Sequence, residues 1–157
     1  MSKEVKAQLS ELLETEEVKN AGFLHDIGKI YIPRDILNKP TKLTDEEFEI
    51  VKQHPIIGEK MLSGIPGLAH VLPVVRHHHE RWDGKGYPDN IGGDEIPYKA
   101  RIISICDAFD AMVSDRPYRE GLSLKEAMRE IKAGSASQFD PVITDVFLKM
   151  VKAKYSI

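Results

Sequence analysis

Apolar side chains recur at helical spacing along almost the whole chain. Leu9, Leu12 and Leu13 lie three and four residues apart with charged residues between them, and no segment alternates with a period of two. The same pattern predicts further helices over residues 16–25, 44–54, 68–81, 98–113, 123–132 and 141–154. The chain is therefore predicted to be all-α, a helical bundle.

Signals for helix starts and interruptions support these boundaries. A Ser or Thr followed three residues later by Glu forms a capping box, and an Asp before Pro suits the first turn of a helix. These signals are Thr44 with Glu47, Ser123 with Glu126, and Asp140 with Pro141. Residues 30–43 are predicted to be a loop, because Pro33 and Pro40 interrupt helices there.

One long glycine-rich stretch, residues 83–97, separates two of the predicted helices. A loop of this length inside a compact domain often has a function, although a plain surface connection is the alternative. The loop follows almost directly after His78 and His79, which favours the functional interpretation.

Composition narrows the class of protein but not its activity. The 157 residues fit one domain, predicted to span 1–157, with ordinary apolar (41%) and charged (30%) fractions for a globular protein. A net charge of −3 provides no basic field for a nucleic acid polymer, and no apolar run is long enough to span a membrane. The single cysteine, Cys106, excludes an internal disulfide and fits a reducing compartment. We therefore expect a soluble, cytoplasmic protein.

Six side chains of the types that bind divalent metals lie between residues 25 and 107. They are His25, Asp26, His54, His78, His79 and Asp107. Imidazole and carboxylate together suit iron, manganese, zinc or nickel, whereas structural zinc sites normally use cysteines. Asp26 stands inside an apolar stretch, where a carboxylate without a partner would be costly. The set indicates a metal centre that activates water for hydrolysis, in preference to scattered surface or core histidines.

Longer motifs around these residues resemble those of a known family. His25-Asp26-Ile27-Gly28-Lys29 resembles the HD motif of the HD phosphohydrolase superfamily. Residues 78–88, which end in Gly86-Tyr87-Pro88, resemble the defining motif of its HD-GYP subgroup. Residues 115–119 and 138–141 fit the same subgroup, and the resemblance covers roughly residues 16–150.

The resemblance implies an activity and a set of metal ligands. Members of the subgroup are bacterial signalling phosphodiesterases that hydrolyse cyclic di-GMP to pGpG or GMP, with two or three metals that are commonly iron or manganese. By this resemblance, Asp26 would bridge two metals and take part in catalysis. His25 and Asp107 would bind one of these metals. The other would be bound by His54, His78 and His79.

The resemblance also implies roles for four further residues. Lys29 would contact a substrate phosphate, Asp110 would orient or deprotonate the attacking water, and Arg116 and Arg119 would bind phosphate. Each has an alternative: Lys29 can complement a helix C-terminus, Asp110 can hold a histidine ligand, and the arginines can pair with neighbouring acids. In the family, the loop with Gly86-Tyr87-Pro88 is also a proposed surface for diguanylate cyclase domains.

Three residues of the long motif have more than one interpretation. Glu80 is either a partner of a metal ligand or a solvated helix residue. Tyr87 either stacks on a guanine or packs under its own loop, and Trp82 is predicted to be the hydrophobic anchor of that loop.

One departure from the family pattern concerns the metal centre. Family members supply a further histidine from a helix before the His-Asp pair, and His25 is the first histidine in this sequence. The site of His54, His78 and His79 is therefore expected to fill first, and the site of His25 and Asp107 to be weak. The alternative function is a weak or silent metal- or nucleotide-binding signalling domain that acts through partners. A third possibility is hydrolysis of a different cyclic dinucleotide.

Overall fold

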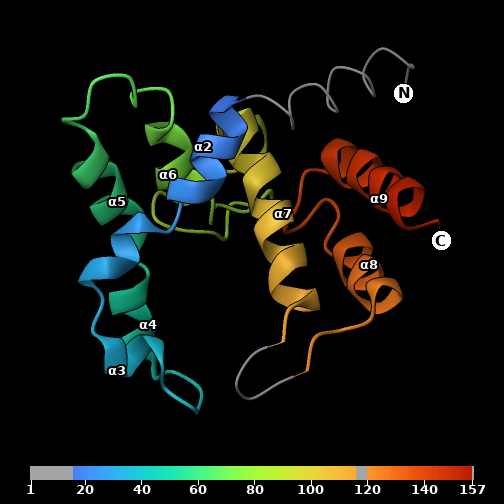
Figure 1. Cartoon of the computed structure of the whole chain (residues 1–157), viewed down its shortest axis with the longest axis horizontal. Coiled ribbons are helices and arrows are strands. Elements are labelled where there is room, and N and C mark those ends of the chain that lie inside the picture. Colours follow the sequence, from blue (N-terminus) through green and yellow to red (C-terminus); the bar gives the residue numbers. More distant parts are fainter. Residues whose placement is uncertain (1–15, 116–119, 157) are drawn as a thin grey trace.

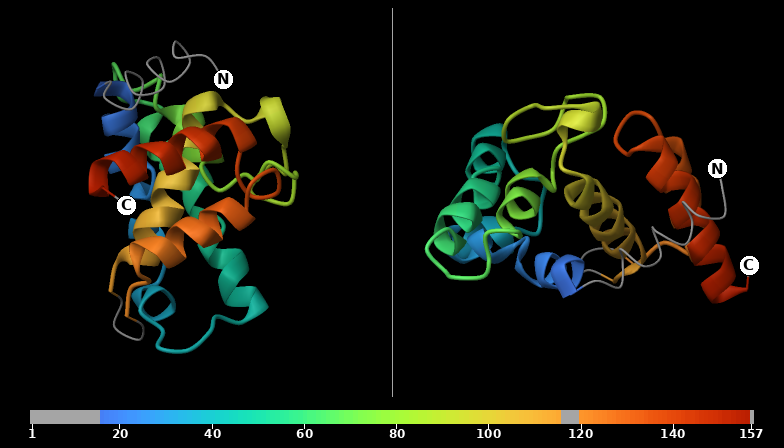
Figure 2. Two further views of the ribbon diagram at one scale, coloured as in Figure 1. Left: turned by 90° about the vertical axis from the view of Figure 1, so that its right-hand side faces the viewer. Right: turned by 90° about the horizontal axis from the view of Figure 1, so that it is seen from above.

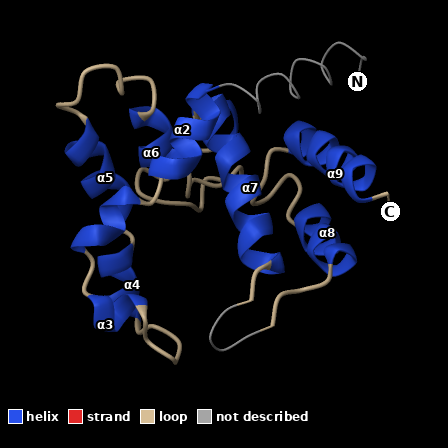
Figure 3. Cartoon of the chain, in the orientation of Figure 1, coloured by secondary structure: helices blue, strands red, loops and turns tan. Residues whose placement is uncertain are grey.

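The computed structural model describes residues 16–115 and 120–156. Apart from one isolated bridge between Ser135 and Phe139, every regular element in these residues is helical, which confirms the all-α prediction (Figure 3). None of the described helices is both long enough and apolar enough to cross a membrane. The predicted helix with Leu9, Leu12 and Leu13 lies outside the described residues.

The helices follow one another along the chain with short connections, except for the loop before η2 (Figure 1). They are α2 (Glu16–Leu24), η1 (Ile27–Tyr31), α3 (Arg34–Leu37), α4 (Asp45–Val51), α5 (His54–Leu62), α6 (Leu72–His77), η2 (Gly93–Glu95), α7 (Tyr98–Val113), α8 (Leu124–Ala133) and α9 (Pro141–Tyr155).

Helix α7 runs through the middle of the fold and has the predicted bounds. Figure 1 shows α2 to α6 on one side of it and α8 and α9 on the other, and the view from above in Figure 2 places α7 between α6 and α9. Ile102, Ile103 and Ile105 of α7 are buried, as its near-continuous apolar surface predicts. The core therefore extends to both sides of α7, and the residues on that helix are held firmly in place.

The capping signals in the sequence are all used. Both predicted capping boxes form, at Thr44 and at Ser123. Asp140 accepts hydrogen bonds from the backbone N–H groups of Val142 and Ile143, and Arg101 of α7 donates to its second oxygen at 2.8 Å. The segment 138–141 thus caps α9 and ties it to α7.

The helix predicted over residues 44–54 is wrong at its end. It stops at Val51, and α5, which the sequence did not predict, begins at His54 with Pro55 in its first turn.

Two further predicted boundaries are wrong, and in both a helix begins beside a proline. Residues 30–43 are not wholly a loop, because η1 continues to Tyr31 and Pro33 precedes α3 instead of preventing it. The helix predicted over 68–81 is shorter, since it begins at Leu72 with Pro73 in its first turn and ends at His77. Proline fits the start of a helix, where its missing N–H would have no partner.

Gly28 permits a close contact between η1 and α5. A Cβ atom at this position would lie 2.0 Å from the carbonyl oxygen of His54 and 2.7 Å from the backbone nitrogen of Gly58. Backbone cannot move aside as the end of a side chain can, so only glycine allows this approach. The contact brings Asp26, which precedes η1, beside His54, the first residue of α5.

We expect Gly28→Ala to destabilise the protein, because the added methyl group would push η1 away from α5. The loss should be about 1–3 kcal/mol or more, the usual cost of overpacking. Urea unfolding measures it, with Gly64→Ala as the control, since a Cβ at Gly64 meets no atom within 4 Å. Equal stability of the two variants would contradict this role for Gly28.

Candidate metal centre

Four predicted ligands form one tight group. The ligand atoms of Asp26, His54, His78 and His79 all lie within 4.8 Å of one another. Asp26 precedes η1, His54 begins α5, and the two adjacent histidines follow the last residue of α6. The group therefore depends on the ends of three helical elements that meet at one point.

The two oxygens of Asp26 face different sides. Oδ1 lies 3.2 Å from Nε2 of His54 and 3.8 Å from Nε2 of His78. Oδ2 lies 3.5 Å from Nε2 of His25. On that side, Asp107 of α7 completes the set, with its Oδ1 3.6 Å from the same His25 nitrogen. A carboxylate in this position can serve two cations, one on each side.

Three of the histidines are oriented in the same way by the backbone. In each ring Nδ1 lies close to a carbonyl oxygen three residues earlier, at 2.6 Å for His25, 2.7 Å for His54 and 2.8 Å for His78. A carbonyl oxygen can only accept, so Nδ1 carries the hydrogen and Nε2 presents a lone pair to the cluster. This is the arrangement that metal-binding histidines require.

The lone pairs of the cluster are left facing one another. Nε2 of His54 and Nε2 of His78 are 3.4 Å apart, and both rings are buried. Asp26 Oδ1 and His25 Nε2 are also buried and have no hydrogen-bond partner among the described residues. Buried acceptors without donors are costly, and a divalent cation would satisfy several of them at once. The residues present therefore fit a metal with imidazole and carboxylate ligands.

Burial keeps two of the imidazoles neutral. It is the main cause that lowers the pKa of His79 to about 2, and it also lowers the pKa of His78. Burial would lower the pKa of His25 too, but the Asp107 and Asp26 carboxylates beside it outweigh burial and raise it. The two sides of Asp26 are thus electrostatically different.

Asp26 is ionised despite its burial. Burial opposes the charged form, but the Lys29 ammonium beside it holds the pKa of the carboxyl well below its ordinary range. Nζ of Lys29 lies 2.6 Å from Oδ2 of Asp26. Lys29 therefore pairs with Asp26 at the cluster, a contact that the sequence did not predict, and its contact with substrate stays a prediction.

The loop after the histidines packs directly against them. A Cβ at Gly86 would lie 2.6 Å from the carbonyl oxygen of His79 and 2.5 Å from the backbone nitrogen of Arg81. This close approach places Tyr87 on His79, with ring centroids 4.8 Å apart and planes at 28°. Tyr87 thus packs against a candidate metal ligand, a position that the sequence alone did not predict.

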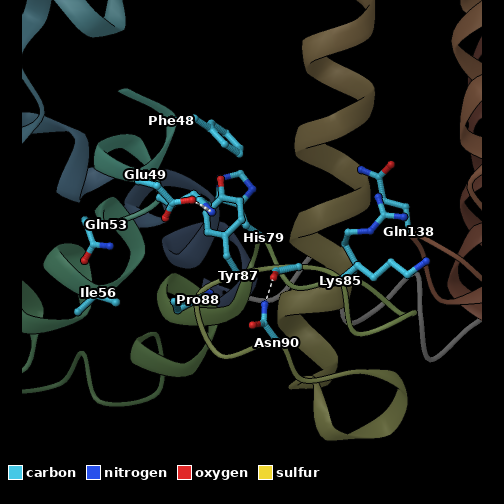
Figure 4. Close-up of a pocket in the computed structure, with 13 residues that line it drawn as sticks. Phe48, Glu49, Gln53, Ile56, His79, Lys85, Tyr87, Pro88, Asn90 and Gln138 are labelled. Carbon is cyan, nitrogen blue, oxygen red and sulfur yellow. Dashed lines mark hydrogen bonds and ion pairs between the residues drawn. The ribbon is translucent and has the colours of Figure 1, made fainter. Parts of the chain in front are cut away.

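A hollow of about 510 Å³ opens beside His79 and the Tyr87 ring (Figure 4). Phe48 of α4 lies at its edge, 45% exposed, with its ring 6.1 Å from that of Tyr87. Figure 4 shows these rings between Gln53 and Ile56 on one side and Lys85 and Gln138 on the other. The sequence did not predict that Phe48 and Gln138 line this hollow. Phe48 belongs to none of the motifs, and Gln138 lies in the segment 138–141, which fits the subgroup but indicates no position for the side chain.

The remaining predicted residues are placed less centrally or lie outside the described part. Asp110 is exposed and lines a separate hollow with Phe109 and Phe147, so its role toward water stays a prediction. Arg116 and Arg119 lie outside the described residues. Trp82 is half-buried beside Ile96 and Phe139, and Arg101 lies over its ring, consistent with an anchor for the loop.

Comparisons with known proteins point to one family. A model of the HD domain matches residues 4–143. A cyclic di-GMP phosphodiesterase of Thermotoga maritima is 48% identical over 146 residues, which cover 92% of this chain and 39% of that protein. A cyclic di-GMP phosphodiesterase of Pseudomonas aeruginosa is 46% identical over 132 residues, covering 83% and 32%. A 3'3'-cGAMP-specific phosphodiesterase of Vibrio cholerae is 36% identical over 140 residues, covering 87% and 26%.

Two solved structures share the fold. Bd1817, an HDG"Y"P protein from Bdellovibrio bacteriovorus, superimposes with a TM-score of 0.72 at 19% identity, over 94% of this chain and 48% of that one. A cyclic GMP-AMP-specific phosphodiesterase of Vibrio cholerae gives 0.62 at 19% identity, over 92% and 41%. At these identities the likeness concerns the fold alone.

Asp26→Ala should remove most of the bound metal while the helical content stays largely intact. The carboxylate is the one ligand that faces both sides of the cluster, and loss of even an indirect partner of a metal ligand costs roughly 10–100-fold in affinity. Elemental analysis and far-UV circular dichroism measure the two effects. Asp35→Ala on α3 is the control, since Asp35 is exposed and its carboxylate belongs to no group of candidate ligand atoms among the described residues. Unchanged metal content in the Asp26 variant would rule out the bridging role.

Proposed function

We propose that this chain, which belongs to the HD domain family and to its HD-GYP subgroup, acts as a metal-dependent phosphodiesterase on a cyclic dinucleotide, with cyclic di-GMP as the leading substrate. One observation carries the proposal: two Nε2 lone pairs lie 3.4 Å apart beside an ionised carboxylate. The names of the relatives support the substrate class. The chain spans 39% of the Thermotoga maritima protein, so that protein's activity applies here only as a proposal.

The chain's own residues would hold and orient the reacting groups. When bound, divalent cations, for which we propose iron or manganese, activate water and offset the charge that develops at phosphorus. The backbone carbonyls that bind the Nδ1 atoms keep His25, His54 and His78 in position. Asp26 joins the two sides, and Lys29 beside it offers a positive charge to a phosphate oxygen.

The hollow beside His79 suits one half of a dinucleotide. Phe48 and Tyr87 provide aromatic surface for a base, and Lys85, whose ammonium makes no ion pair with a described residue, provides a cation near the opening. A volume of about 510 Å³ is in the usual range for a small-molecule site. Contact of the Gly86-Tyr87-Pro88 loop with diguanylate cyclase domains stays a prediction.

The test is hydrolysis by the purified chain after loading with Mn²⁺ or Fe²⁺ in the absence of oxygen. We expect cyclic di-GMP to be converted to pGpG or GMP, and the reaction to stop after chelation or in His54→Ala. His70→Ala is the control, because His70 is an exposed histidine outside the cluster. A parallel assay with 3'3'-cGAMP separates the two substrate classes named among the relatives. No turnover of either compound by fully metal-loaded protein would overturn the proposed activity.

We also propose that the two sides of Asp26 bind metal with unequal affinity. One side offers the group of Asp26, His54, His78 and His79, while the other offers His25 and Asp107 beside the same carboxylate. More protein ligands within reach mean tighter binding, so the first site should fill before the second.

Titration of Mn²⁺ into metal-free protein measures this difference. We expect two steps, the tighter one lost in His54→Ala and the weaker one lost in Asp107→Ala. Two sites of equal affinity in a monomer would contradict unequal binding, and the result does not depend on whether the chain hydrolyses cyclic di-GMP.

A further inference from the structure

A second group of metal-ligating side chains lies on the outer side of the histidine motif. Ligand atoms of His77, Glu80 and Asp89 all lie within 4.8 Å of one another. His77 ends α6, Glu80 follows three residues later, and Asp89 belongs to the long loop. His77 precedes the motif of residues 78–88 and has no role in the proposed reaction.

Two polar atoms of this group are buried without a hydrogen-bond partner among the described residues. Oε2 of Glu80 and Nδ1 of His77 make no hydrogen bond with any described residue. Glu80 is only 2% exposed, and Oδ2 of Asp89 lies 3.3 Å from Nδ1 of His77. A buried carboxylate oxygen without a donor is expensive, so something other than the described side chains must stabilise it.

The backbone of the loop fixes the Glu80 carboxylate in place. Its Oε1 accepts the N–H of Asp89 at 2.6 Å and the N–H of Asn90 at 3.1 Å. Because one oxygen is held by these two donors, Oε2 cannot turn away to find a partner of its own. Glu80 is therefore a partner of the loop, not the solvated helix residue that the sequence allowed.

The charges around the group favour a cation. Arg76 forms a two-point ion pair with Asp89, at 2.7 and 2.8 Å, and reaches Glu59 at 2.6 Å. Among the described residues, the Arg76 guanidinium thus pairs with Glu59 and Asp89, and it makes no ion pair with Glu80, whose carboxylate lies beside that of Asp89. The excess negative charge of these carboxylates lies next to the imidazole nitrogen of His77. Carboxylate and imidazole are both usual ligands of zinc.

We propose that His77, Glu80 and Asp89 form a separate site for a divalent transition-metal ion of the zinc type, which fastens the loop to the end of α6. One imidazole nitrogen and two carboxylate oxygens are a normal three-residue set for such an ion, with water in the remaining position. With a position left to water, the site differs from closed structural zinc sites, which normally use cysteines. It would hold Asp89, and with it the loop residues that follow Tyr87, against the histidine motif. It would exist whatever reaction the central cluster performs.

The main test is zinc stoichiometry and affinity in the whole 157-residue chain. The metal-free protein is titrated with Zn²⁺ and, after removal of loosely bound ions, its zinc content is measured by elemental analysis. We expect the wild-type chain to hold one equivalent more than His77→Gln, or to bind that equivalent at least ~10-fold more tightly. His70→Gln is the matched control for adventitious binding by an exposed histidine and should behave as wild type.

The variant Glu80→Gln tests whether a metal ion or a proton stabilises Oε2 of Glu80. A glutamine can still accept the two loop N–H groups, and its amide would replace a protonated carboxyl group as a donor toward His77. Loss of the zinc equivalent in Glu80→Gln, with an unchanged melting temperature in the absence of metal, supports the site. Identical zinc content and affinity in wild type, His77→Gln and Glu80→Gln would overturn it.

Proteolysis of the loop gives an independent readout. Zinc should slow cleavage between residues 83 and 97 in the wild type, and this protection should disappear in His77→Gln while the central cluster keeps its ligands. Equal protection in both proteins would show that zinc acts through the central cluster, which would also overturn the proposal.

Discussion

The structure depends on a group of buried lone pairs that no donor among the described residues satisfies. Nε2 of His54 and Nε2 of His78 face each other at 3.4 Å, next to an Asp26 oxygen without a hydrogen-bond partner. Such a group repels itself unless a cation lies within it. The fold holds it together by local means, because each Nδ1 is bound to a carbonyl at the end of the preceding helix or turn. The rings therefore cannot rotate to relieve the repulsion.

The position of the cluster follows from one close backbone contact and one central helix. Gly28 lets η1 approach α5 so closely that any side chain would strike the His54 carbonyl. Helix α7 brings Asp107, which lies 82 residues after His25 in the sequence, to within 3.6 Å of it, and its buried isoleucines fix its rotation. The geometry of the candidate metal centre and the stability of the fold therefore depend on the same few contacts.

The long motif has two faces. Its inner side carries His78 and His79 to the central cluster, and Gly86 allows Tyr87 to stack on His79. On its outer side, the Glu80 carboxylate accepts hydrogen bonds from the backbone N–H groups of Asp89 and Asn90. The same short segment thus supplies ligands and closes the loop that lines the hollow, which explains why glycine, glutamate and histidine occur there together.

The sequence by itself determined the local features. The capping boxes at Thr44 and Ser123, the bounds of α7 and the ligand types of the cluster depend on spacing of a few residues, which a sequence displays directly. Only the tertiary structure decided which side of Asp26 each histidine faces, that Phe48 borders the hollow, and that Asp110 lines a different one. It also revealed the outer group of His77, Glu80 and Asp89. These relations join residues on different elements, and their distances are set by packing between helices, which local periodicity does not encode.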